Sequence, residues 1–145
     1  MPVTRRLACA VAAAVLLAAC GGAAAPGDAA SSAPPTPDGP RPSTPARLEI
    51  ERPKPGRAVT GSTVELRIRL EGARIVPLTT TDIVPDEGHL HVTLDDRLIS
   101  MTEGLQQTIP DVEPGTHRIT VEFVASDHAP FDPRLVAVTV FEVTP

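Results

Sequence analysis

The chain has 145 residues, with 13 Lys and Arg, 18 Asp and Glu, and a formal net charge of −5 at pH 7. An acidic protein gains little from contacts with phosphate groups, so nucleic acid is not an expected partner. The chain holds three Phe, no Trp and no Tyr. Sugar-binding modules usually present exposed aromatic platforms, so the composition also argues against carbohydrate binding.

The N-terminus has the pattern of a signal peptide. Arg5 and Arg6 supply the positive region, and residues 7–17 form an apolar, Ala-rich segment. This segment is too short to span a bilayer, which takes about 20 apolar residues. It closes at residues 17–20 with the sequence LAAC, which resembles the lipobox of bacterial lipoproteins. The resemblance implies cleavage before Cys20 and attachment of diacylglycerol to its thiol, with an ordinary secretory signal as the alternative.

Lipidation decides where the protein is expected to lie. Removal of residues 1–19 as a lipoprotein signal peptide makes Cys20 the first residue of the mature chain. Acyl chains such as palmitate, two or three on one cysteine, hold a protein stably on a membrane. Cys9 leaves with the signal, so no disulfide is expected. We expect a lipid anchor in the cell membrane, an extracytoplasmic location and an envelope protein as a further partner.

A tether is predicted to separate the anchor from one folded domain. Residues 20–46 contain seven prolines among Ala, Ser, Gly and Thr, a composition that forms no hydrophobic core. An extended segment of this kind reaches up to roughly 80 Å, at about 3.1 Å per residue. Residues 47–145 are long enough for one small domain.

Apolar and polar residues alternate along the domain, which predicts β-strands. The clearest case is residues 64–70, where Val64, Leu66 and Ile68 alternate with charged residues. Residues 135–143 are apolar on both faces and are expected to form a central or sandwiched strand. The pattern predicts an immunoglobulin-like β-sandwich of about seven short strands, with a small barrel as the alternative. Further strands are expected at residues 48–50, 73–78, 90–94, 98–101, 105–109 and 117–125.

All four histidines lie within residues 88–133. His89 and His91 are two residues apart in an expected strand, so their side chains leave one face with Cα atoms about 6.6 Å apart. Two imidazoles at this spacing can share a metal ion, with His128 as a third ligand, and imidazole suits copper, zinc or nickel. The sequence therefore leads to the hypothesis of a copper or zinc site at these three histidines. A polar strand face bonded to its neighbours is the alternative.

The loop at residues 126–133 holds two Asp and two Pro, which predicts a rigid turn. Ordered loops on β scaffolds also carry binding sites, so a structural and a binding role for His128 both stay open. Asp127 or Asp86 is the expected oxygen donor to a metal. His117 follows a Pro-Gly turn and shares a face with apolar residues, so its ring is expected to bond a nearby backbone group.

Three blocks of sequence carry a further resemblance. They are GHLH at residues 88–91, PGTHRITV at 114–121 and DHAPFDP at 127–133. In this order they resemble an uncharacterised family of small exported bacterial proteins with an immunoglobulin-like β fold. That family has a Gly-His-His-His strand, and here Leu90 replaces the middle histidine. The resemblance covers residues 88 to about 143 and implies a fold and an export route without a reaction.

Catalysis finds little support in the sequence. The serines lack the Gly-x-Ser-x-Gly setting of a hydrolase nucleophile. Asp95 and Asp96 are adjacent in sequence, so on a strand they would point to opposite faces, and a hairpin turn explains them better than an acid–base pair. We expect a non-enzymatic binding or scaffolding domain of unknown ligand, with a metal-binding lipoprotein as the alternative.

Overall fold

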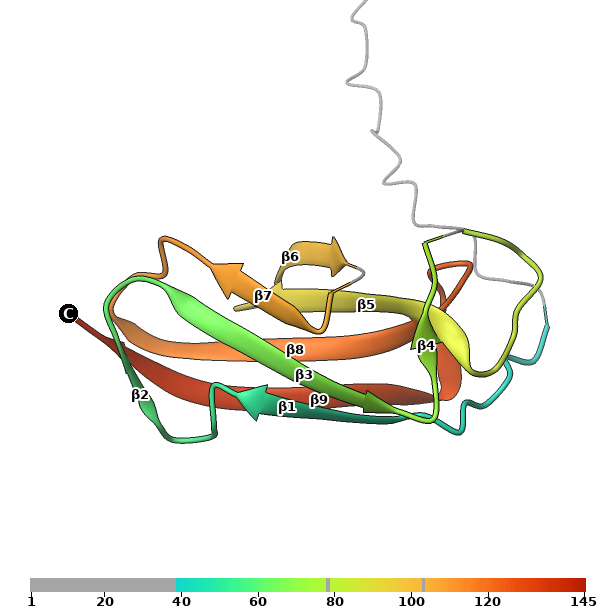
Figure 1. The fold of residues 1–145 in the computed structure, drawn as a ribbon, viewed down its shortest axis with the longest axis horizontal. Helices are drawn as coiled ribbons and strands as arrows, with labels where there is room; N and C mark the ends of the chain where they lie inside the picture. The colour runs from blue at the N-terminus through green and yellow to red at the C-terminus, as the bar shows by residue number, and fades with distance from the viewer. Residues whose placement is uncertain (1–38, 78, 103) are drawn as a thin grey trace, which may run out of the picture. The chain divides into compact units, whose positions relative to one another are not determined.

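The computed structural model describes residues 39–77, 79–102 and 104–145, all of which fall in one compact unit. The predicted signal peptide, Cys20 and most of the predicted tether lie outside these residues. Within the described part, no helix is long and apolar enough to cross a membrane. The described residues form nine strands (Figure 1): β1 Arg47–Arg52, β2 Ala58–Thr60, β3 Val64–Glu71, β4 Arg74–Ile75, β5 Glu87–Leu94, β6 Arg97–Thr102, β7 Gln106–Ile109, β8 Gly115–Ala125 and β9 Pro130–Thr144.

The strands make two sheets. The smaller sheet has the order β1-β3-β7, and the larger has the order β2-β9-β8-β5. The far edge of β5 pairs in parallel with β4 at its start and antiparallel with β6 along the rest. Figure 1 shows the smaller sheet lying across the long strands β8 and β9. The fold is an immunoglobulin-like β-sandwich, as predicted. Among the described residues, the very short β2 is the additional strand, and β4 covers two residues of the strand predicted at residues 73–78.

The core fills the space between the sheets. On β3, Val64, Leu66 and Ile68 are buried while the residues between them are exposed, because side chains alternate between the faces of a strand. Phe123 and Phe131 stack with ring centroids 5.5 Å apart. The buried apolar residues of the larger sheet include Leu90, Val92, Ile119, Val121, Phe123, Phe131, Phe141 and Val143.

The last strand is central in the larger sheet, between β2 and β8, as predicted, but one of its faces is exposed. β9 begins earlier than expected, at Pro130, and its inward face carries Phe141 and Val143. Its other face belongs to the outside of the two-layer sandwich, and no further layer of the described residues packs on it. Val136, Val138 and Val140 therefore stand 40%, 53% and 46% exposed.

Packing begins before residue 47, where the domain was predicted to start. Ala46 is buried in the core cluster. The carbonyl of Pro42 accepts a hydrogen bond from the N–H of Asp132 at 3.0 Å. Arg41 binds the loop between β8 and β9. The folded part of the chain thus includes residues 41–46, which the sequence assigned to the tether.

Candidate functional site

Three of the four histidines meet at one end of the larger sheet. His89 and His91 leave the outer face of β5, since Leu90 and Val92 between and beside them point into the core. His128 reaches the same place from the loop between β8 and β9. Its ring stacks on that of His89 with centroids 4.2 Å apart and planes at 6°, and lies 5.4 Å from the ring of His91. The structure brings together the three side chains that the sequence singled out.

The loop that carries His128 is a three-residue hairpin connection. The N–H of His128 donates to the carbonyl of Ala125 at 2.9 Å, and the N–H of Ala125 donates to the carbonyl of Ala129 at 3.0 Å. His128 has a φ of +63°, the left-handed conformation that glycine most often takes in such loops. Histidine is among the residues enriched in this region, so the loop can place an imidazole there.

Arg41 holds the same loop. Its Nη1 and Nη2 donate to Oδ2 and Oδ1 of Asp127 at 2.7 and 2.9 Å. Its Nε and Nη2 also donate to the carbonyls of Pro130 and Ala129, at 2.8 and 3.0 Å. The hydrogen bond from Arg41 is the main cause that lowers the pKa of Asp127. The carboxylate considered as a metal ligand is thus charged and already bound to an arginine.

A second loop covers the histidines. The N–H of Thr80 donates to the carbonyl of Ser126 at 3.1 Å, and the hydroxyl of Thr79 lies 3.1 Å from Nε2 of His128. Beneath these two loops His89 is only 6% exposed, although it lies on the outer face of the sheet. His91 and His128 are half-buried. The cluster is therefore closed at His89 and reachable from solvent at the other two rings.

Hydrogen bonds define the state of the rings. Nε2 of His89 lies 3.3 Å from the carbonyl oxygen of Ser126, which can only accept, so this nitrogen carries the hydrogen. Nε2 of His91 lies 3.1 Å from Nδ1 of His128, so at most one of the two is protonated. Burial lowers the pKa of His91, and His128 lowers it further, while Glu122 opposes them. Burial also lowers the pKa of His128, with an added effect of His89. His91 and His128 are thus neutral at pH 7.

Within the part of the chain that the structure describes, no group of three or more His, Cys, Asp or Glu side chains is placed to hold a metal ion. Stacking accounts for this at the cluster. An imidazole binds a metal in the plane of its ring, and the parallel rings of His89 and His128 lie in different planes. Asp86 is exposed on the covering loop. Metal ligation by His89, His91 and His128 together stays a prediction.

Residues 1–144 match the family model described as "Family of unknown function (DUF6130)". The chain belongs to this family. This confirms the expectation that the chain belongs to an uncharacterised family. No curated protein sequence matches the chain.

Solved structures similar to this DUF6130 member include three β domains. The fibronectin(III)-like modules of Clostridium thermocellum CbhA match at 17% identity and a TM-score of 0.47, over 66% of this chain and 93% of theirs. The PKD domain of human KIAA0319 matches at 16% identity and a TM-score of 0.45, over 77% of this chain and 91% of its own. A CARDB domain from Pyrococcus furiosus matches at 14% identity and a TM-score of 0.44, over 71% of this chain and 97% of its own. The site of this DUF6130 member has to be understood from its own geometry.

The fourth histidine of this DUF6130 member lies near the other end of β8. Nε2–H of His117 donates to the carbonyl of Glu113 at 2.7 Å, which confirms the predicted bond to a nearby backbone group. Its Nδ1 lies 2.7 Å from Oδ2 of Asp95, a contact that was not predicted. Both ring nitrogens face acceptors, so the charged imidazolium satisfies both. The hydrogen bond to Asp95 is the main cause that raises the pKa of His117.

Asp95 and Asp96 form the predicted hairpin turn, between β5 and β6. Their φ values are 49° and 67°, as tight two-residue hairpin turns require. Asp95 Oδ1 accepts the backbone N–H of Arg118 at 2.9 Å, and Asp96 Oδ1 accepts from its Nη2 at 2.6 Å. The two carboxylates thus bind different groups and fix the turn to β8.

The outer face of the larger sheet carries an apolar row. Val136, Val138 and Val140, which we call the β9 valine row, follow one another on this face. Their partners on β8 are Glu122, Thr120 and Arg118. Glu122 pairs with Arg134 at 2.6 Å, and Arg118 pairs with Asp96 at 2.6 Å. An exposed apolar row next to fixed ion pairs has the apolar centre and polar rim of a protein interface.

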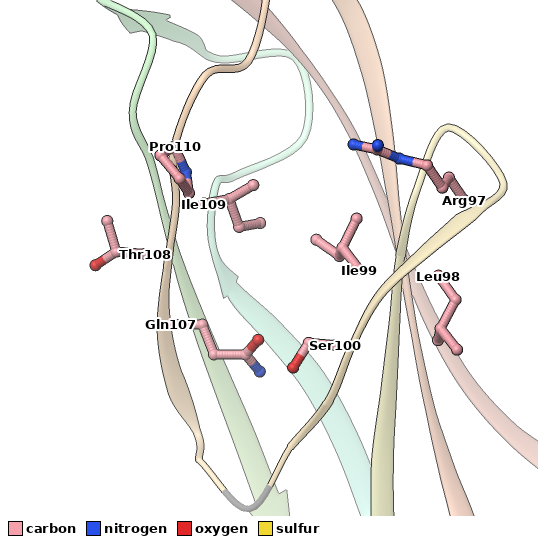
Figure 2. A pocket seen from close by; sticks show the side chains of 8 residues that line it. All are labelled: Arg97, Leu98, Ile99, Ser100, Gln107, Thr108, Ile109 and Pro110. Carbon is pink, nitrogen blue, oxygen red and sulfur yellow. The ribbon is translucent and has the colours of Figure 1, made fainter.

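A groove of about 620 Å³ lies between β6 and β7 (Figure 2). Ile99 and Ile109 point toward each other across it, and Arg97 is its one charged residue. None of the clustered histidines lines the groove. Its walls are Arg97, Leu98, Ile99, Ser100, Gln107, Thr108, Ile109 and Pro110.

Sequence reasoning missed three groups around the histidines: Arg41, Thr79 and Ser126. Arg41 lies 86 residues from Asp127 in the chain, so no local pattern joins them. One signal was present, because Arg41 is the only basic residue between positions 21 and 46. An isolated basic residue in a Pro-rich stretch was a hint that the domain starts earlier.

Proposed function

We propose that this chain is a lipid-anchored protein on the extracytoplasmic face of the cell membrane, and that its domain is a non-enzymatic module that binds another envelope protein. The observation that carries the proposal is the β9 valine row. Val138, in the middle of a long paired strand, is 53% exposed. Removing apolar surface from water stabilises a complex by about 25 cal/mol per Å², so the row favours association.

The charges around the row favour a protein as the partner. The Arg134–Glu122 and Arg118–Asp96 pairs fix guanidinium and carboxylate groups beside the valines. Such groups at a rim select a partner of complementary charge more than they add affinity. The net charge of −5 disfavours binding to anionic lipid headgroups or nucleic acid.

The anchoring half of the proposal rests on Cys20 and the segment after it. The sequence LAAC at residues 17–20 supports acylation of this cysteine. The packed part of the domain begins by Arg41, which leaves about 20 residues between the two, or roughly 60 Å in extended geometry. A tether of this length lets the domain reach a partner away from the bilayer surface.

Site-specific photo-crosslinking in cells tests the binding half. A photoreactive residue at Val138 should give a discrete product with an envelope protein. The same residue at Leu105, an apolar position outside the row that is 38% exposed, should not. Val138→Glu should reduce capture of the partner by crosslinks placed elsewhere on the face, and Leu105→Glu should not. Equal crosslinking at both positions, or none at Val138, would refute the proposed surface.

Labelling with a fatty acid and membrane fractionation test the anchoring half. The unmutated chain should incorporate labelled palmitate and sediment with membranes. Cys20→Ser should abolish the label and leave the protein unprocessed or released, whereas Cys9→Ser should change neither. Retention of a cleaved Cys20→Ser protein on membranes would contradict the lipid anchor.

A further inference from the structure

We propose that His91 and His128 form a two-nitrogen site for a divalent transition metal ion, with His89 as a supporting ring rather than a ligand. The site shares no residue with the valine row, although Glu122, which pairs with Val136, also pairs with His91 on β5. Three features of the cluster carry the inference: the distance between two ring nitrogens, the partner of the remaining nitrogen of His128, and the stacking of His89.

The distance fits a shared metal. Nε2 of His91 and Nδ1 of His128 are 3.1 Å apart. Two nitrogens that each lie about 2.0–2.1 Å from an ion are about 3.3 Å apart at a tetrahedral angle and about 2.9 Å apart at a right angle. The observed separation falls between these values. The two rings face each other edge to edge, with centroids 5.4 Å apart, so both nitrogens can bind one ion once each ring tilts to point its lone pair at the ion.

Thr79 sets the state of His128 that a metal needs. Its hydroxyl lies 3.1 Å from Nε2 of His128 and can accept a hydrogen bond from it. With the hydrogen on Nε2, the lone pair is on Nδ1, which faces His91. Metal-binding histidines commonly donate their other N–H to an oxygen in this way, which orients the ring.

The loop holds His128 in place before an ion arrives. The backbone of His128 is in the left-handed region at a φ of +63°, and the neighbouring Asp127 is bound by both Nη atoms of Arg41. A non-glycine residue in this conformation is costly and persists where the surroundings fix it. A ring that is already ordered loses little conformational freedom on binding.

His89 has a different part in the cluster. Its Nε2–H is engaged by the carbonyl of Ser126 at 3.3 Å, and its plane is 6° from that of His128 at a centroid distance of 4.2 Å. An ion in the plane of the His128 ring lies outside the plane of the His89 ring. His89 therefore supports the face of His128 without reaching the ion.

Two protein nitrogens leave coordination positions for water or an external ligand, as in exchanging rather than structural sites. His91 and His128 are half-buried, so such a ligand can reach the ion. Among the divalent ions that imidazole favours, Cu(II) is bound most tightly. The site thus fits capture and release of Cu(II), with Zn(II) bound more weakly.

Calorimetric titration of the full chain with Cu(II) and with Zn(II) tests the site, using protein without a polyhistidine tag and with free thiols alkylated. We expect one ion per chain, and an electron paramagnetic resonance spectrum of the Cu(II) form with hyperfine structure from two nitrogens. His91→Gln and His128→Asn should each abolish stoichiometric uptake. Asparagine also tolerates positive φ, so the second change keeps the loop.

Two variants and one direct measurement make the result decisive. His89→Phe keeps a ring against His128 and should retain uptake, and His117→Gln, outside the cluster, should also retain it. Nitrogen-15 spectra of the unmutated chain should show shifts at His91 and His128 on addition of Zn(II), without any mutation. No uptake by the unmutated chain, loss of uptake in His89→Phe with the fold intact, or shifts confined to His117 would each overturn the proposal.

Discussion

His117 and Asp95 make the stability of the domain depend on pH. The pKa of His117 is raised in the folded state, chiefly by its hydrogen bond to Asp95, so its contribution is full below the ordinary value of 6.5 and is lost as pH rises through the folded value. Burial alone would raise the pKa of Asp95, but bonds from Arg118 and His117 lower it. The contribution of Asp95 is therefore present above 3.8 and lost as pH falls through the lowered value.

Urea unfolding of the wild type and of His117→Gln at about pH 5.5 and about pH 8 measures this contribution. The difference in free energy of unfolding between the two proteins should be larger at the lower pH. Asp95 is 49% exposed, so solvent weakens the pair and the change should stay under about 1 kcal/mol. His91 and His128 have an opposite effect of pH on stability, but both proteins contain them. Their effect therefore cancels when the free energy of unfolding of one protein is subtracted from that of the other. A difference that is the same at both pH values would contradict the assigned pair.

Gly88, next to His89, lies where there is no room for a side chain. A Cβ at this position would lie 1.9 Å from the backbone oxygen of Val124 and 3.0 Å from Cζ of Phe123. We expect Gly88→Ala to destabilise the domain by about 1–3 kcal/mol or more, because a backbone atom has to move and not a flexible side chain. Thermal unfolding measures the loss. Gly56→Ala is the control, since Gly56 has positive φ but open space around it, and it should cost about 1 kcal/mol; equal losses would contradict crowding at Gly88.

At the scale of elements, the loop between β8 and β9 depends on Arg41. Arg41→Ala leaves the carboxylate of Asp127, 14% exposed, without its main partner. A nearly buried carboxylate that loses a bidentate partner costs about 1–3 kcal/mol. Hydrogen exchange at the amides of Ala125 and His128 should become faster together with this loss of stability. Arg69→Ala is the matched control, because its pair with Glu51 is exposed and should contribute little to stability. Equal effects of the two changes would contradict the role of Arg41.

Strands could be predicted where one face is buried and the other is wet. The alternation of Val64, Leu66 and Ile68 with charged residues gave β3 from local sequence alone. A strand was expected at residues 73–78, but β4 is limited to Arg74 and Ile75, the two residues that pair with β5. The exposed face of β9 could not be predicted, because exposed valines and valines in a core have the same sequence pattern.

At the scale of the whole molecule, the histidine cluster joins parts of the chain that sequence treats separately. The spacing of His89 and His91 predicted a shared face, which depends only on the period of a strand. The position of His128 depends on a hairpin loop, on Arg41 from before the first strand, and on Thr79 from another loop. These contacts join residues that are far apart in the sequence, and no periodic pattern marks them. The arrangement of the three histidines can therefore be known only from the folded structure.

The start of the domain is the remaining feature that the whole fold decides. A chain that begins at Gly39 keeps the Arg41–Asp127 pair, the bond from Asp132 to the carbonyl of Pro42 and the buried Ala46. A chain that begins at Arg47 loses all three. We expect the longer version to unfold with the same midpoint in urea as the mature protein. The shorter one should lose about 1–3 kcal/mol or more, at least the cost of Arg41→Ala. Equal midpoints for the two versions would show that residues 41–46 add nothing to the stability of the sandwich.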